Sequence, residues 1–185
     1  GEFIKDPLIV VKEDEIADII FNHEELPADV DIIDLEGCTL LPGFIDAHDH
    51  LALSPQLENH IQLMDDPTPA QMIRAIDNMK IDLMQGITTS RCLGDKNFID
   101  IYLREAQAEG IIDGPTIITS TRGIKPTHAH GVVGTVFNGP EEIRKAVREN
   151  IKQGADFIKL FLTDTVREAE YMPYYMSDEE MIVAV

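Results

Sequence analysis

The sequence predicts an α/β fold: about the first four βα units of a (β/α)8 TIM-type barrel, preceded by a short segment of β-strands. A strand-like apolar run is followed by a segment of helical periodicity, a glycine and the next strand, and this pattern occurs about four times. The loops after the strands are long, whereas the turns after the helices are short. This asymmetry is typical of barrels whose strand-end loops form the site. A full barrel has eight such units in roughly 250 residues, so the four units predicted here make about half a barrel.

Residues 1–41 are predicted to form part of a small β-sandwich domain. An apolar run covers 8–11, a loosely alternating run covers 30–35, and Glu36-Gly37 forms a hairpin turn before 38–41. Because unpaired edge strands favour association, we expect further chain to complete this layer. The barrel half is predicted to cover 42–185.

The first barrel unit begins with a compact apolar run over 40–47, which is typical of a strand buried on both faces. A long loop over 51–67 follows. Thr68 and Gln71 have the spacing of a capping box, and Pro69 suits the first helical position. We therefore expect a helix from Thr68 that ends before Gly86.

The later units repeat this pattern. The expected strands cover 87–92, 116–120 and 155–162, and the expected helices cover about 97–109 and 140–153, with a last helix opened by a capping box at Ser177. A doubly wound parallel sheet is the alternative architecture. No GxGxxG motif follows any of the strands, which favours the barrel.

The composition excludes several classes of protein. Asp and Glu number 34 against 15 Lys and Arg, so the net charge of −19 argues against a nucleic-acid partner. The sequence contains no apolar run of about 18 residues, so we expect no membrane-spanning helix. The two cysteines do not form a disulfide framework. We expect a cytoplasmic protein without a membrane partner. Because half a barrel exposes sheet edges, we also expect a homo-oligomer or pairing with the missing barrel half.

Two histidines follow the first barrel strand. His48 and His50 are two residues apart, so on a strand they share one face at its carboxyl end, where barrels place their sites. Paired imidazoles suit Zn²⁺ or a similar transition metal. Asp46 shares this face and could accept a hydrogen bond from a ring N–H. The alternative is a pair of polar loop histidines.

Lys159 lies among apolar residues in the predicted strand 155–162. A buried ammonium is costly unless it is paired or neutralised. Three interpretations remain open at this point: an ion pair inside the barrel, a lysine that reaches water at the strand end, and an amine carboxylated by carbon dioxide that binds metal.

Polar residues also follow the second and third strands. His130, in a second His-x-His pair with His128, is better suited to polarising or binding a substrate than to metal ligation. Arg122 could hold a substrate carboxylate, as could Arg91, or form an ion pair with a local aspartate such as Asp95.

Four segments together resemble the metal-dependent amidohydrolase superfamily. Residues 41–50 resemble its first-strand motif, 86–91 its second-strand segment, and 154–159 the fourth strand of members with a carboxylated lysine. Residues 114–131 are similar to the third-strand region of the branch with prolidase-like and carboxypeptidase-like enzymes, with imidazolonepropionases more distant. The resemblance runs from about residue 35 to the end.

The resemblance implies a binuclear zinc site that hydrolyses an amide or peptide-like C–N bond of a small-molecule or dipeptide-like substrate. His48 and His50 would hold one zinc ion, carboxylated Lys159 would bridge both, and a metal-bound hydroxide would attack the carbonyl. His130 would contact the substrate. Other divalent metals are compatible with such a site.

The superfamily takes two further histidines and an aspartate from later strands, and these are not among the 185 residues. We therefore expect this chain alone to lack the full ligand set, and its catalytic acid or base to lie beyond Val185. Two other functions stay open: a binding or assembly module with a vestigial site, and a mononuclear deaminase relative.

Overall fold

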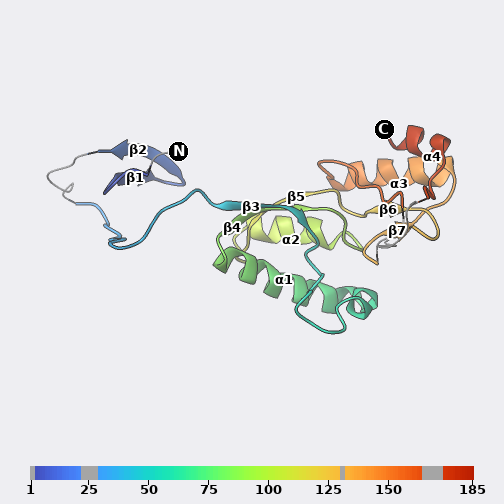
Figure 1. Ribbon diagram of the computed structural model, residues 1–185, viewed down its shortest axis with the longest axis horizontal. Helices are drawn as coiled ribbons and strands as arrows, with labels where there is room; N and C mark the ends of the chain where they lie inside the picture. Colours follow the sequence, from blue (N-terminus) through green and yellow to red (C-terminus); the bar gives the residue numbers. More distant parts are fainter. Residues whose placement is uncertain (1–2, 22–28, 130–131, 164–172) are drawn as a thin grey trace. The chain divides into compact units, whose positions relative to one another are not determined.

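The computed structural model describes residues 3–21, 29–129, 132–163 and 173–185. The chain divides into two compact units, Gly1–Leu41 and Pro42–Val185. In the first unit, β1 (Leu8–Lys12) and β2 (Glu15–Ile20) form an antiparallel hairpin (Figure 1). The predicted turn at Glu36-Gly37 is also present, because the Cys38 N–H donates to the Leu35 carbonyl at 2.9 Å. The described residues between 29 and 41 form no strand.

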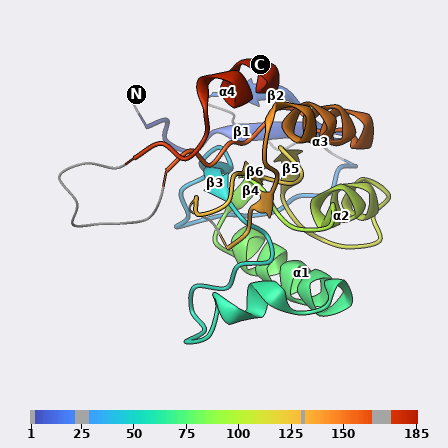
Figure 2. The ribbon, with the colours of Figure 1, turned by 90° about the vertical axis from the view of Figure 1, so that its right-hand side faces the viewer.

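The second unit contains a three-stranded parallel sheet, which confirms the predicted βα repeat. Its strands are β3 (Phe44–Asp49), β4 (Ile87–Cys92) and β5 (Thr116–Thr119), in that order. The connections contain the 3₁₀ helix η1 (Gln62–Asp65), α1 (Thr68–Met84) and α2 (Ile99–Ala108). In Figure 2, α1, α2 and α3 (Pro140–Gln153) follow one another around one side of the strands, as the outer helices of a partial barrel do.

The predicted strand 155–162 is not a regular strand, and only an isolated bridge joins Leu160 to Ile124. The Asp156 N–H donates to the Thr119 carbonyl at 2.8 Å, so this segment does begin to pair with the end of β5. Thr121 then takes the left-handed conformation, with φ of 58°. This turn interrupts the ladder, and pairing resumes at Ile124 with the short parallel pair of β6 (Ile124–Lys125) and β7 (Thr135–Val136) beside it.

Two apolar clusters hold this unit together. The larger one packs residues after β3 against α1, α2 and the sheet, and it includes Leu51, Met79 and Leu103. The smaller one joins α3 to α4 (Asp178–Ala184) through residues such as Ile143 and Ala184. The prediction that the first strand is buried on both faces is wrong. Its residues are largely exposed, and within the described part of the chain β3 is an edge strand with a neighbour on one side.

The helix starts only partly match the predictions. The predicted capping box at Thr68 is wrong, since the N-cap residue is Pro67 and no side chain caps it. Gln71 instead donates to the carbonyls of Met64 and Asp66, at 3.1 and 2.7 Å. The capping box at Ser177 is confirmed, with Glu180 as its partner. None of the helices in the described ranges combines the length and apolar character needed to cross a bilayer.

Candidate metal centre

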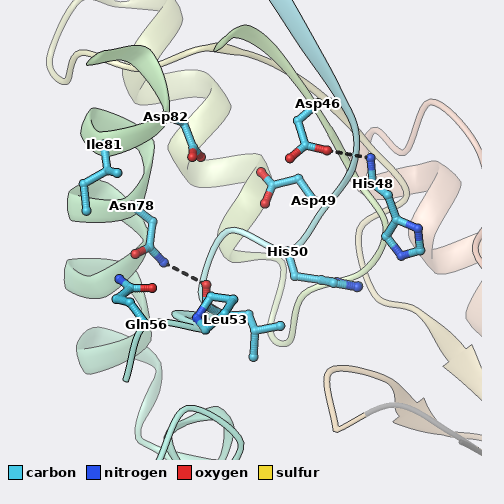
Figure 3. A pocket seen from close by; sticks show the side chains of 10 residues that line it. Asp46, His48, Asp49, His50, Leu53, Gln56, Asn78, Ile81 and Asp82 are labelled. Carbon is cyan, nitrogen blue, oxygen red and sulfur yellow. Dashed lines mark hydrogen bonds between the residues drawn. The ribbon is translucent and has the colours of Figure 1, made fainter. Parts of the chain in front are cut away.

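The two histidines of the first barrel strand lie side by side at its carboxyl end. His48 lies within β3 and His50 directly follows it. Their ring centroids are 5.6 Å apart and the rings are inclined by 65°. Figure 3 shows both rings extending away from α1, whereas the carboxylate of Asp49 lies toward Asp82. The spacing in sequence therefore places both imidazoles on one side of the strand, as expected for alternate residues.

The ring of His50 is oriented by the segment that follows β4. Its Nδ1 atom lies 2.7 Å from the carbonyl oxygen of Gly94. A carbonyl oxygen only accepts, so Nδ1 carries a hydrogen, and in the neutral ring the lone pair is then on Nε2. Metal-binding histidines commonly donate one ring N–H to a carbonyl in this way. The geometry and chemistry of His50 thus fit a zinc-type cation.

The carboxylates near the histidines face a cavity of about 440 Å³ between β3 and α1. Burial, followed by the charge of Asp82, raises the pKa of Asp49 to about 6. Burial and then the charge of Asp46 raise the pKa of Asp82 in turn. The cavity is therefore lined by three carboxyl groups, those of Asp46, Asp49 and Asp82, beside a pair of imidazoles.

Asp46 contacts His48 differently from the prediction. Its Oδ1 accepts a hydrogen bond from the backbone N–H of His48 at 2.8 Å, drawn as a dashed line in Figure 3. This contact is a local side-chain to backbone bond across two residues. Asp46 therefore helps to fix the main chain at His48, and the predicted bond to a ring N–H is not the one that the structure shows.

The amine of Lys159 lies close to one member of the larger apolar cluster. Its Nζ is 4.7 Å from the ring centroid of Phe161, a member of that cluster. Burial, followed by the charge of Arg91, lowers the pKa of Lys159. Arg91 stacks on the ring of Phe157 at 4.1 Å and donates to the Ala47 carbonyl at 3.4 Å. Arg91 therefore lies between the histidine-bearing strand and the lysine segment.

Arg122 is held by helix α3. Its guanidinium forms an ion pair of 2.8 Å with Glu149 and donates at 3.3 Å to the side-chain oxygen of Asn150. The rings of Phe98 and Phe137 lie 4.3 and 5.3 Å from its Cζ. The ion-pair alternative is thus the one observed, with Glu149 in place of Asp95, and substrate binding by Arg122 stays a prediction.

His130 lies outside the described residues. His128, two positions earlier, has a left-handed backbone with φ of 74°, and its ring centroid is 6.5 Å from that of Tyr175. Among the residues that the structure describes, no three His, Cys, Asp or Glu side chains gather in an arrangement that could hold a metal ion. The metal-binding roles of His48, His50 and Lys159 therefore stay predictions.

The comparisons with known proteins identify the family. The family model described as the amidohydrolase family matches residues 39–185, and the chain belongs to this family. An imidazolonepropionase from Picrophilus torridus is 24% identical over 182 residues, which are 96% of this chain and 42% of that protein.

Solved structures give the same result. A prolidase in complex with N-methylphosphonate-L-proline is 27% identical with a TM-score of 0.79, over 96% of this chain and 47% of its own. A Xaa-Pro dipeptidase with bound methionine is 29% identical with a TM-score of 0.75, over 95% and 47%. The chain thus spans about half the length of these relatives, in agreement with a partial barrel.

Proposed function

We propose that this chain is the N-terminal part of a metal-dependent amidohydrolase that hydrolyses a C–N bond in a small, dipeptide-like substrate. The observation that carries the proposal is the pair of imidazoles at the carboxyl end of β3, with the tautomer of His50 set by Gly94. Membership of the amidohydrolase family supports it. The substrate class is supported by two structural relatives, a prolidase and a Xaa-Pro dipeptidase.

The proposed cofactor is a pair of zinc ions, with His48 and His50 on one ion and carboxylated Lys159 between both. A divalent cation in such a site polarises a carbonyl group and lowers the pKa of bound water. Lys159 would carry a carbamate, formed when its neutral amine bonds to the carbon of carbon dioxide and releases a proton. Burial and Arg91, which lower the pKa of Lys159, favour the neutral amine.

The substrate contacts in this proposal come from the part of the sequence that follows β5. His130 would contact the substrate's carbonyl or carboxylate, by its match to the motif of the family. Arg122 would take part only if its guanidinium exchanged Glu149 for the substrate, so its contribution is the more costly of the two. The catalytic acid or base would come from strands that complete the barrel.

The test is metal analysis of the purified full-length protein and its variants. We expect zinc in the wild type, a large loss in the His48→Ala and His50→Ala variants, and loss of part of the metal in Lys159→Ala. His60→Ala and Lys152→Ala are the matched controls: neither residue lines the cavity beside the two histidines, so both variants should leave the metal content unchanged. Less than about one metal ion per two folded wild-type chains would overturn the proposal.

The same variants separate the two rival functions. A Lys159→Ala protein that keeps its metal and its activity would favour the mononuclear deaminase relative, because a single-metal site needs no bridging ligand. A folded, monodisperse monomer without bound metal would favour the binding or assembly module.

A further inference from the structure

In the two residues directly after His50, Leu51 and Ala52, every backbone N–H and carbonyl group forms a hydrogen bond with a side chain. The N–H groups of Leu51 and Ala52 donate to the two carboxylate oxygens of Asp95, at 3.0 and 3.2 Å. The Leu51 carbonyl accepts from Asn78 at 2.7 Å, and the Ala52 carbonyl accepts from Arg74 at 2.9 Å. We call this set of contacts the 51–52 anchor.

The anchor is buried and fully satisfied. Leu51 and Ala52 are 1% and 0% exposed, so each of their backbone groups needs a protein partner. Asp95, also 0% exposed, supplies half of those partners with a single side chain. Removing its carboxylate would leave two buried N–H groups without acceptors, and the chain after His50 would have to move to reach others.

Asp95 and its neighbour in sequence fix His50 from two directions. Gly94 accepts the hydrogen bond from the imidazole ring, and Asp95 holds the main chain that follows. The backbone of Asp95 is itself bound to the segment that follows β5, since its N–H donates to the Thr121 carbonyl at 3.1 Å. The position of the His50 ring is therefore coupled to the ends of β4 and β5.

Keeping a carboxyl group at this position is costly. Burial, followed by the charge of Asp100, raises the pKa of Asp95 to about 8, although the N–H groups of Ala52 and Leu51 act in the opposite direction. Among the residues that the structure describes, the carboxylate of Asp95 accepts from the loop beside His50. Costly buried polar groups of this kind are expected where a site has to be held in place.

We propose that Asp95 is a positioning residue for the metal centre: through the backbone of Leu51 and Ala52 it holds His50 in the orientation that binds the cation. This inference rests on the proposed function, because it assumes that His50 is a metal ligand. Asp95 itself binds no metal in this proposal.

The test is a Co²⁺ titration of the full-length protein with the metal removed, followed by the visible absorption of the bound ion and by chelator competition. In Asp95→Asn, one acceptor oxygen is replaced by an NH₂ group that opposes a backbone N–H. We expect Co²⁺ to bind about 10- to 100-fold more weakly, with an altered absorption spectrum, as for other groups that orient metal ligands.

The matched control is Asp100→Asn. Asp100 is equally buried, but its carboxylate accepts from Thr119 and from the Ile101 N–H and does not contact the 51–52 anchor. We expect this variant to lose stability while its Co²⁺ affinity and spectrum stay at the wild-type values. Equal effects of the two substitutions on affinity would overturn the proposal, because they would show a general loss of structure.

A second variant keeps the test decisive if Asp95→Asn does not fold. Asn78→Ala removes a half-buried amide that donates to Leu51 and, at 3.1 Å, to Leu53. It should weaken Co²⁺ binding in the same direction, whereas Asp77→Ala, on the exposed side of α1, should not. Wild-type affinity and spectrum in either Asp95→Asn or Asn78→Ala would overturn the inference, and a wild-type protein that binds no Co²⁺ would overturn the proposed function itself.

Discussion

The carbonyl oxygen of Gly94 lies 2.7 Å from Nδ1 of His50, so the loop after β4 orients a side chain that follows β3. Only glycine suits this position. Its φ is 113°, and a Cβ atom there would lie 2.9 Å from both the N and the Cα of Gly123. The close approach of these two glycines therefore places the carbonyl group that selects the tautomer of His50.

Gly94→Ala should destabilise the protein and weaken metal binding together. We expect a loss of at least about 2 kcal/mol in the free energy of unfolding, from backbone strain and from the contact with Gly123. Denaturant unfolding and zinc affinity measure the two effects. Gly110→Ala is the control, since its φ is 70° but nothing lies within 4 Å. Unchanged zinc affinity in Gly94→Ala would contradict the role given to its carbonyl group.

Gln71 and Thr68 should differ in their contributions to stability. Gln71 is buried and donates to two loop carbonyls, whereas Thr68 does not cap its helix. We expect Gln71→Ala to cost about 1–3 kcal/mol and Thr68→Ala to cost less than about 0.5 kcal/mol. Urea unfolding distinguishes them. A larger loss of stability in Thr68→Ala than in Gln71→Ala would instead support the capping box that the sequence predicts.

Arg122→Ala should affect stability through its contacts with α3. Loss of the bonds to Glu149 and Asn150 should cost about 1–3 kcal/mol, with zinc affinity unchanged. Arg148→Ala removes the same charge from an exposed position of α3 and should be nearly neutral. If Arg122 instead binds the substrate, its replacement will raise KM for a dipeptide carboxylate by much more than it lowers stability.

Glu180 should give stability that depends on pH. Its carboxylate accepts from the N–H groups of Ser177 and Gly139, and these bonds, with that to Ser177 first, lower the pKa of Glu180. A lowered pKa stabilises the fold above the group's ordinary value of 4.5, and this contribution is lost as the pH falls through the lower folded value.

Glu180→Gln should therefore cost about 1 kcal/mol at pH 7, and the difference from the wild type should shrink below the ordinary pKa of the carboxyl group and disappear below its lowered folded value. Urea unfolding between pH 7 and pH 3 measures it. Glu179→Gln, on the exposed side of the same turn, should follow the wild type throughout. If the free energies of unfolding of the wild type and Glu180→Gln differed by the same amount at every pH, the pH-dependent contribution assigned to Glu180 would be contradicted.

Local chemistry made much of the fold predictable. The helix over 68–84 and the helix from Pro140 to the stop at Gly154 follow from apolar spacing and terminal residues. The prediction of a strand over 155–162 was wrong because the pairing of this segment depends on the turn at Thr121. The left-handed backbone of that turn is not predicted by any sequence rule for threonine. The edge position of β3 depends on the order of strands, which periodicity alone does not contain.

The candidate metal ligands of the site could be predicted from the sequence, but the residues that orient those ligands could not. The His-x-His spacing gives the shared direction of the His48 and His50 rings. From the sequence, Asp95 was predicted only as an ion-pair partner. Its carboxylate instead accepts hydrogen bonds from backbone N–H groups more than 40 positions away, which the sequence does not indicate. The available signal was an aspartate directly after a glycine, shortly beyond the predicted strand 87–92, and it does not identify the groups that the aspartate contacts.

The 51–52 anchor acts on the peptide groups of Leu51 and Ala52 and not on their side chains. Replacements of similar volume at these two positions, such as Leu51→Met, should therefore leave the geometry around the cation intact. The same protection should make both amides among the slowest to exchange with deuterium in the region around His50. The backbone position of the segment after His50 is thus determined by three polar residues distant in sequence, Arg74, Asn78 and Asp95. The side chains of Leu51 and Ala52 only have to fit the apolar core.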